Sequence, residues 1–469
     1  MSGMNIKENG SPWLFIVFPA ITMLLGWGLR GYIGGGPFGA MIPGAMVALS
    51  IAVLLDLPAE VASVFVVFGV VGIGLGGEMT YGQTIGFLRN PDTMWWGTLG
   101  LTVKGGIWGL PGGIILAIGL IYHRLTKKTI IITFLLLLAG MLVGFKLINQ
   151  PMIIYFSDPA KPRPESWGAL LVGAVAMLIY LKNKVESSVF KIISRFALWG
   201  LIGGAAGFGL GGFLIVMGSH FPKEFIFQSW WKAMEFTFGL LFGATLGYAA
   251  WCSRNEISVE KSATPVETHF AYQSAIKEIV VTFLTGLLIF WLFSTLLDPV
   301  VDAGKGAAGF TMIGFTDIAK ILSNFAFFGL ILILVVMRFP PVAWQLSITL
   351  TFCHTVMDLM KGYFIETGSS VTGLALILIM TLVVAVLTAW FQRRKDSLHA
   401  LFLLLIWSTV MVAFLRLGIK PEVFNISGLP LCEIVCGRFF VHIVFTASAI
   451  YISWISRRIM RGNNTLRGN

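Results

Sequence analysis

The chain has 469 residues, of which 57% are apolar and only 12% are charged, and its mean hydropathy is +0.86. A soluble domain carries roughly a quarter charged residues, so this composition excludes an ordinary soluble enzyme, a disordered protein and a nucleic-acid-binding protein. The formal net charge of +11 then indicates orientation in a membrane rather than a polyanionic partner.

Apolar windows recur along the whole chain, and a membrane span needs about 20 mostly apolar residues. We count about fourteen such windows, near 12–30, 37–55, 61–88, 94–122, 129–148, 166–183, 194–217, 228–252, 273–296, 319–338, 342–362, 369–391, 399–417 and 437–456. Only helices and closed barrels satisfy every backbone polar group in lipid, and the alternation typical of a barrel is absent. The sequence therefore predicts an all-α, polytopic integral membrane protein.

Charges in the loops predict its orientation. Alternate connections are basic, and they contain Arg124, Lys127, Lys128, Lys182, Lys184, Lys191, Arg195, Arg393, Arg394 and Lys395, while the tail contains Arg457, Arg458, Arg461 and Arg467. Basic loops remain in the cytoplasm, and an even number of spans then places both termini there. We expect a multi-pass protein of the plasma (inner) membrane, with lipid as a partner.

An internal repeat divides the chain. The stretch FGAMIPGAMVAL at 38–49 recurs as WGALLVGAVAML at 167–178, GIGLGG at 72–77 recurs as GFGLGG at 207–212, and the Trp pair at 95–96 recurs at 230–231. Because the order of the three motifs is shared, we interpret spans 1–4 and 5–8 as parallel copies related by a twofold along the membrane normal. The predicted units are a first repeat at 1–125, a second at 126–252, a cytoplasmic linker at 253–272 and a six-helix part at 273–469.

Glycine clusters predict interrupted helices. The window 61–88 would be ~42 Å long as a single helix, so we expect a break at Gly74–Gly77, after which the chain folds back or lies at the outer face. The window 94–122 is also too long and contains Lys104–Gly106 and Pro111–Gly113. A further glycine-rich stretch, from Gly26 to Gly36, connects the first two spans. Interrupted helices at paired positions of a repeat indicate a transport site.

Charges lie beside these clusters. Lys104 lies about 12 Å below the interface that Trp95 and Trp96 mark, and a lysine at that depth needs a partner or water. Glu78 is the expected partner. The sequence predicts one polar cavity that binds substrate through Arg30, Glu78, Gln83, Lys104, Trp95 and Trp96. In the second repeat Phe213 stands where the first has Glu78, with Lys232 and Glu235 as a reduced contribution.

Structural interpretations compete with this one. Arg30 ends a span and can reach the headgroups. Glu78 and Lys104 can form a buried pair that binds no ligand. The tryptophans are typical of interface anchors, and the glycines are typical of close helix packing.

A second group of candidate residues lies in the six-helix part. His354 and Asp358 are four residues apart and share a helix face, with Cys353 and Lys361 nearby, and a histidine beside a carboxylate can act as a base. A structural hydrogen bond is the alternative. Cys432, Cys436 and His442 fall short of the four ligands that a structural zinc site needs, so we predict no metal and no cofactor.

These features favour a secondary permease that moves a small polar or anionic solute through a cavity lined by broken helices. The alternative is a membrane-embedded transferase that acts on a lipid-linked or envelope substrate at the outer face, with His354 as base and Asp358 orienting it. No Walker loop, HExxH or GxSxG motif is present, and we expect no large extramembrane domain to hold a second substrate, so an enzyme is the less favoured class. A scaffold or assembly subunit is a third possibility, but it leaves the charged residues unexplained.

Overall fold

The structure is a computed structural model, and it describes residues 11–79, 81–157, 165–222, 225, 227, 229–261, 274–292, 313–365, 368–419 and 424–467. Over these residues every regular element is helical. The elements of the first half are α1 (Pro12–Ile33), α2 (Gly36–Leu54), α3 (Ala59–Leu75), η1 (Gly76–Glu78), α4 (Thr84–Arg89), α5 (Met94–Leu120), η2 (Tyr122–Arg124), α6 (Lys127–Gly144), η3 (Phe145–Asn149), α7 (Trp167–Lys184), α8 (Ser187–Ser219) and α9 (Trp230–Lys261). Those of the second half are α10 (Ala275–Trp291), α12 (Phe315–Leu322), α13 (Phe325–Arg338), η5 (Pro340–Val342), η6 (Gln345–Thr349), α14 (Leu350–Met360), η7 (Lys361–Ile365), α15 (Ser370–Phe391), α16 (Ser397–Ile419), α17 (Leu431–Glu433), η9 (Ile434–Arg438) and α18 (Phe440–Arg467).

Ten helices in the described part of the chain are long and apolar enough to cross a membrane. The number becomes eleven if α12 and α13, which meet at 55°, form one broken span. The other predicted windows contain the shorter or less apolar helices α7, α10 and α14. The protein is therefore all-helical and multi-pass.

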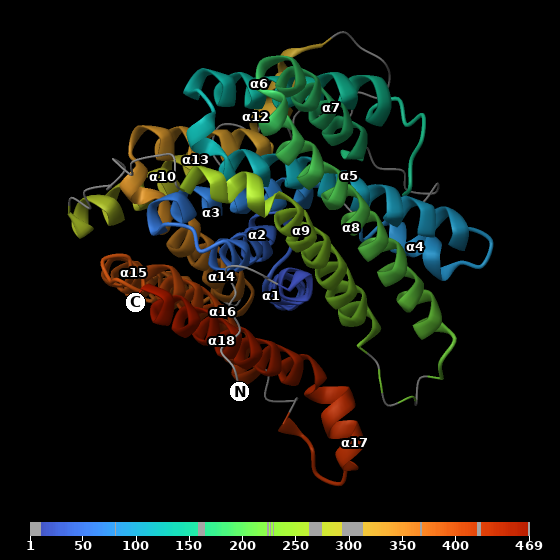
Figure 1. The fold of residues 1–469 in the computed structure, drawn as a ribbon. Coiled ribbons are helices and arrows are strands. Elements are labelled where there is room, and N and C mark those ends of the chain that lie inside the picture. Colours follow the sequence, from blue (N-terminus) through green and yellow to red (C-terminus); the bar gives the residue numbers. More distant parts are fainter. Residues whose placement is uncertain are drawn as a thin grey trace.

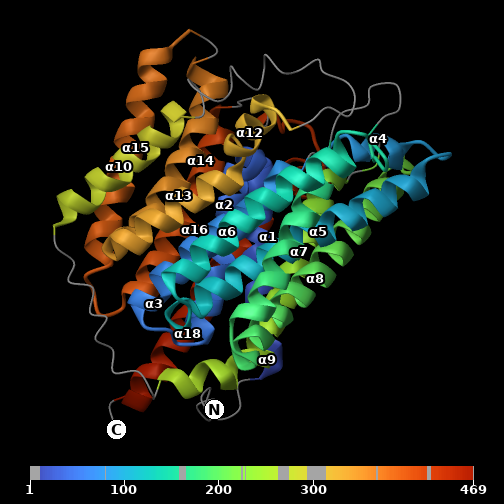
Figure 2. The same ribbon diagram turned by 90° about the horizontal axis from the view of Figure 1, so that it is seen from above.

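The helices form one bundle whose centre is built from the N-terminal third of the chain (Figure 1). In the most apolar window of α5 94% of the residues are buried, whereas the value for α15 is 33%. Figure 2 shows that α1 begins and α18 ends at the same end of the bundle. Basic side chains join the helices there, because Arg124 donates to the Glu256 carbonyl (2.8 Å) and Arg195 to the Glu256 carboxylate (2.8 Å). We call this the basic end.

Of the two windows that we predicted to be too long for one helix, 94–122 is unbroken. Helix α5 runs without interruption through Lys104–Gly106 and Pro111–Gly113, and α8 runs through the GFGLGG motif. Their glycines bring the two helices together instead. A Cβ atom on Gly109 would overlap the Gly200 carbonyl, and one on Gly105 would overlap the Gly204 carbonyl. The packing interpretation therefore holds for these glycines, since small residues four apart allow two helix backbones to touch.

Two other glycine clusters do end helices. Helix α1 ends at Ile33 and α2 begins at Gly36, whose φ of +71° lies in the left-handed region that favours glycine. Helix α3 ends at Leu75, as the predicted break at Gly74–Gly77 requires, and the chain turns back through η1 and α4. The two breaks pack against each other, because a Cβ on Gly77 would overlap the Pro37 backbone. They form a stretch of irregular backbone that is partly buried, with Gly35 exposed.

The boundary of the predicted linker also differs. Helix α9 continues to Lys261, so the first part of the segment 253–272 is helical, and residues 262–272 lie outside the described residues.

Candidate functional site

The segment that follows the break in α3 connects three different helices. Glu78, Tyr81 and Thr84 lie three residues apart along it. The Glu78 carboxylate accepts from the Phe325 N–H of α13 (2.7 Å), the Tyr81 hydroxyl accepts from Arg30 of α1 (3.0 Å), and the Thr84 hydroxyl accepts from Lys104 of α5 (2.7 Å). The segment therefore fixes α1, α5 and α13 relative to one another.

Lys104 is buried, as its depth predicts, but its ion-pair partner is Glu165. The Lys104 Nζ lies 2.6 Å from the Glu165 Oε1, and the two side chains are 1% and 2% exposed. The second carboxylate oxygen of Glu165 accepts from the Phe156 N–H (3.0 Å). Each charge thus has an opposite charge and a further hydrogen bond, which is the arrangement that a buried pair needs.

The predicted pair of Lys104 with Glu78 is therefore wrong. The Glu78 carboxylate binds the first turn of α13, while its backbone carbonyl accepts from the Ser166 hydroxyl (2.9 Å). The sequence places Glu78 and Lys104 in neighbouring windows. In the structure Glu165, just before α7, is the carboxylate that lies beside the lysine. Arg30, Glu78 and Lys104 belong to separate networks along one segment rather than to one cluster.

Arg30 lies in a box of aromatic rings at the end of α1. Its side chain is 3% exposed, and the guanidinium carbon lies 5.2 Å from the Trp27 ring, 5.3 Å from that of Trp108 and 5.5 Å from that of Tyr81. These distances are within the range of cation–π attraction. Besides Tyr81, the guanidinium donates to the Gly36 carbonyl (3.3 Å), which the break between α1 and α2 makes available.

The charge of Arg30 has no carboxylate within ion-pair distance among the described residues. In the part of the chain that the structure describes, the Nε–H of Arg30 has no acceptor, and neither has the buried indole N–H of Trp27 one turn earlier. Buried donors without acceptors are uncommon in folded proteins, and each of them calls for an explanation. An uncompensated buried cation is more unusual still.

A second charged cluster lies beside Arg30 at the end of α1. The Glu235 carboxylate rests on Gly31, where a Cβ would overlap it, and it accepts from Lys232 (2.5 Å) and from the Trp231 indole (2.9 Å). Arg416 of α16 lies 4.6 Å and Lys232 5.8 Å from the Tyr32 ring. Lys232 and Glu235 were predicted as the contribution of the second repeat, and they form an ion pair.

The Tyr32 hydroxyl in turn lies 3.1 Å from the His442 Nε2 of α18. Glu235 of α9, Arg416 of α16 and His442 of α18 therefore all contact the last turn of α1, at Gly31 or Tyr32.

His354 and Asp358 share a face of α14, as their spacing predicts, and their nearest charged atoms are 4.0 Å apart. This distance is too long for a hydrogen bond. The Asp358 carboxylate rests on Gly34, and the His354 ring lies 4.8 Å from that of Phe38. The pair thus borders the break between α1 and α2.

The remaining predicted residues lie at the periphery. Trp95 is 71% exposed, and Trp96 is 42% exposed and donates its indole N–H to the Tyr155 carbonyl (3.0 Å). Such exposed tryptophans at a helix end are typical of interface anchors. Gln83 is half-buried in the turn before α4. The four cysteines are free, and among the described residues no group of three metal-ligating side chains comes together.

No protein-family model, no curated protein and no solved structure matches the chain. The geometry of the chain's own residues therefore carries the functional argument.

Sequence reasoning missed Glu165, Tyr81 and Tyr32. Tyr81 lies within the segment that we predicted to fold back, and its only signal is a polar hydroxyl beside a glycine break. Glu165 lies two residues before the repeated motif that begins at Trp167, so its position just before a predicted span is a usable signal. No feature of the local sequence distinguishes Tyr32.

Proposed function

We propose that the protein is a multi-pass permease that binds a small anionic solute at Arg30. The observation that carries this proposal is the guanidinium of Arg30, which is buried among aromatic rings with two neutral acceptors and an Nε–H that has none. A carboxylate or a phosphate oxygen supplies both the missing acceptor and the missing charge. The aromatic box stabilises the cation while the site is empty.

Two further features support a transport role. The helix breaks at 34–36 and 76–79 lie beside Arg30, and in transporters such breaks occur where the chain lines a binding site. Lys232 and Arg416 lie around the ring of Tyr32, two residues after Arg30, so the region carries several cations. These features favour an anion over a neutral solute.

We also propose that the chain crosses the membrane fourteen times, with α7, α10, α13 and α14 completing the count, and that both termini are cytoplasmic in the plasma membrane. The order α1, α2, α3, α5 followed by α6, α7, α8, α9 fits a duplication of four spans. The two copies then differ at this pair of helices, because α3 ends at the glycine motif whereas α8 continues through its copy of the motif.

Uptake into proteoliposomes tests the proposal. Labelled small carboxylates and inorganic phosphate serve as probes, and Arg30→Gln is expected to lower uptake at least tenfold while Arg30→Lys retains part of it. The matched control is Arg195→Gln, because Arg195 is paired with Glu256 at the basic end. If uptake is the same in Arg30→Gln and in the unmodified protein, Arg30 is structural and the proposal fails.

A membrane-embedded transferase is the second candidate, and one observation favours it. Asp358 and His354 lie against Gly34 and Phe38, so a substrate whose phosphate binds Arg30 places its headgroup near a potential base. This candidate predicts that His354→Ala abolishes turnover of a lipid-linked substrate and leaves solute uptake undetectable in all variants.

A further inference from the structure

A cavity lies between α16 and α18 at the basic end of the bundle. Its volume is about 400 Å³, which is within the range of small-ligand sites. It is lined by Phe391, Arg394, Asp396, His399, Ala400, Leu403, Leu404, Ser456, Arg457 and Met460. The cavity lies far along the bundle from Arg30, which ends α1 at the opposite end.

The lining divides into a polar and an apolar part. His399 and Ser456 join α16 to α18 through a hydrogen bond of 2.8 Å. Leu403 and Leu404 continue along α16 away from the basic end and toward the middle of the bundle. A ligand that fits this order has a polar group at the end of the bundle and an apolar group directed inward.

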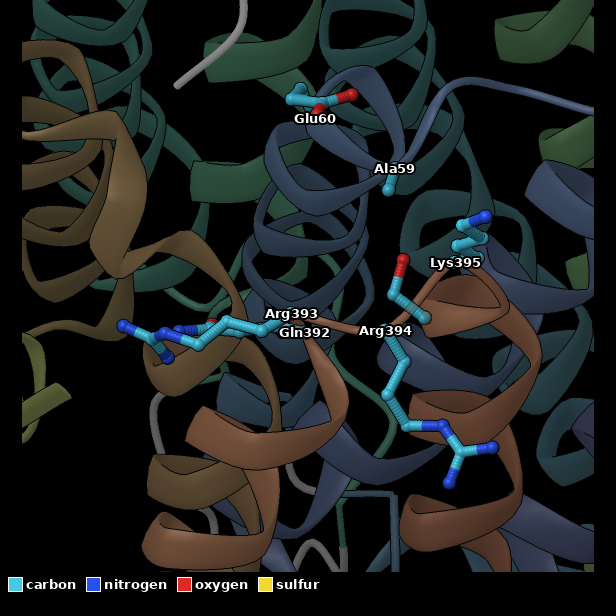
Figure 3. Close-up of a pocket in the computed structure, with 7 residues that line it drawn as sticks. Ala59, Glu60, Gln392, Arg393, Arg394 and Lys395 are labelled. Carbon is cyan, nitrogen blue, oxygen red and sulfur yellow. The ribbon is translucent and has the colours of Figure 1, made fainter. Parts of the chain in front are cut away.

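The polar part is cationic. Arg457 is exposed and has no ion-pair partner among the described residues. Arg394 is paired with Asp396 at 2.9 Å, but the two side chains are 45% and 38% exposed, and such exposed pairs contribute little. Figure 3 draws a neighbouring pocket, in which the side chains of Arg393, Arg394 and Lys395 leave the turn after α15 in different directions. Arg393 donates to the Glu278 carboxylate of α10. Arg394 is therefore the arginine of this turn that reaches the cavity.

Aromatic side chains mark the membrane interface at the same level. Trp390 and Trp454 are 58% and 54% exposed, and the guanidinium carbons of Arg394 and Arg458 lie 5.7 Å and 5.5 Å from their rings. Exposed tryptophans beside arginines are typical of the headgroup level of a bilayer. The cavity thus opens where phospholipid headgroups lie.

We propose that this cavity is a binding site for one glycerophospholipid with an anionic headgroup. Its phosphate lies between Arg394 and Arg457, and one acyl chain follows Leu403 and Leu404. Basic pockets between membrane helices recognise anionic headgroups in this way. The site is independent of the solute proposed for Arg30.

Binding of defined lipids to the delipidated full-length protein tests this proposal. Native mass spectrometry compares phosphatidylglycerol with phosphatidylcholine of the same acyl chains. Phosphatidylglycerol is expected to bind more tightly than phosphatidylcholine. The double variant Arg394→Gln/Arg457→Gln is expected to lower the affinity for phosphatidylglycerol about 30-fold, which is ~2 kcal/mol. Arg458→Gln is the matched control, because Arg458 is equally basic and stacks on Trp454 outside the cavity; it should bind like the unmodified protein.

A variant that gains affinity separates the proposal from misfolding. Asp396→Asn releases Arg394 from its carboxylate, so phosphatidylglycerol is expected to bind about threefold more tightly. Equal binding of both lipids, or an unchanged preference in the double arginine variant, would overturn the proposal. It also fails if inorganic phosphate at millimolar concentration displaces phosphatidylglycerol, because the cavity is then a phosphate site.

Discussion

The buried ion pair of Lys104 and Glu165 makes the sharpest prediction about stability. The two side chains are 1% and 2% exposed, so removing either partner leaves a charge in an apolar interior. Lys104→Met leaves the Glu165 carboxylate with the Phe156 N–H, and Glu165→Gln leaves the ammonium with the Thr84 hydroxyl. Each single variant is expected to lose about 3–5 kcal/mol of unfolding free energy.

The double variant Lys104→Met/Glu165→Gln contains neither charge. Its loss is expected to be smaller than the sum of the single losses by at least ~1 kcal/mol, since residues in one network are coupled. Unfolding by SDS in mixed micelles measures all three variants. Asp396→Asn is the control, because it breaks an exposed pair and should change the free energy by less than about 1 kcal/mol. Additive single losses, or single losses no larger than that of the control, would refute the assigned pairing.

Three further predictions follow from the glycines and the exposed tryptophan. Gly109→Val pushes α5 away from the Gly200 carbonyl and should lower the unfolding free energy by at least ~2 kcal/mol in the same assay. Gly86→Ala is the control, because Gly86 has open space around it; equal effects of the two variants would contradict the close packing. Gly36→Ala places a side chain at φ +71° and should lose about 1–2 kcal/mol and reduce anion uptake, while Gly35→Ala serves as its control. Trp95→Ala removes a side chain that is 71% exposed and should leave uptake unchanged within twofold; a larger loss would return Trp95 to the binding site.

The sequence predicts the helices better than it predicts their partners. The first window, 12–30, matches α1 (Pro12–Ile33), and the break expected at Gly74–Gly77 occurs at Gly76. Both depend on local chemistry, because apolar length defines a span and adjacent glycines release the backbone from helical angles.

Glycines inside α5 and α8 could not be interpreted in the same way. Glycine ends a helix in one setting and allows close packing in another, and the choice depends on whether a second backbone lies opposite. For Gly109 the opposite backbone is that of Gly200, which lies more than 90 residues later in the sequence. No periodicity in either helix alone identifies this contact.

The ion pairs show the same limitation. Depth in the membrane predicts that Lys104 is buried and needs a partner, and the structure agrees. Which carboxylate it meets depends on how the chain returns after η3, and that path is a property of tertiary packing. Arg30 was a candidate for its position at the end of a span. Its distinguishing feature is that no carboxylate of the described residues lies within ion-pair distance of it, which a sequence cannot reveal.

Contact between Tyr32 and His442 joins the first long helix to the last one, 410 positions apart. During biosynthesis about 400 further residues are added after α1 before α18 is made. Until α18 is made, Tyr32 lacks its contact with His442, and Gly28 lacks the Phe445 ring that packs on it. Truncation before α18 therefore uncovers one side of α1 at the positions two residues before and two residues after Arg30.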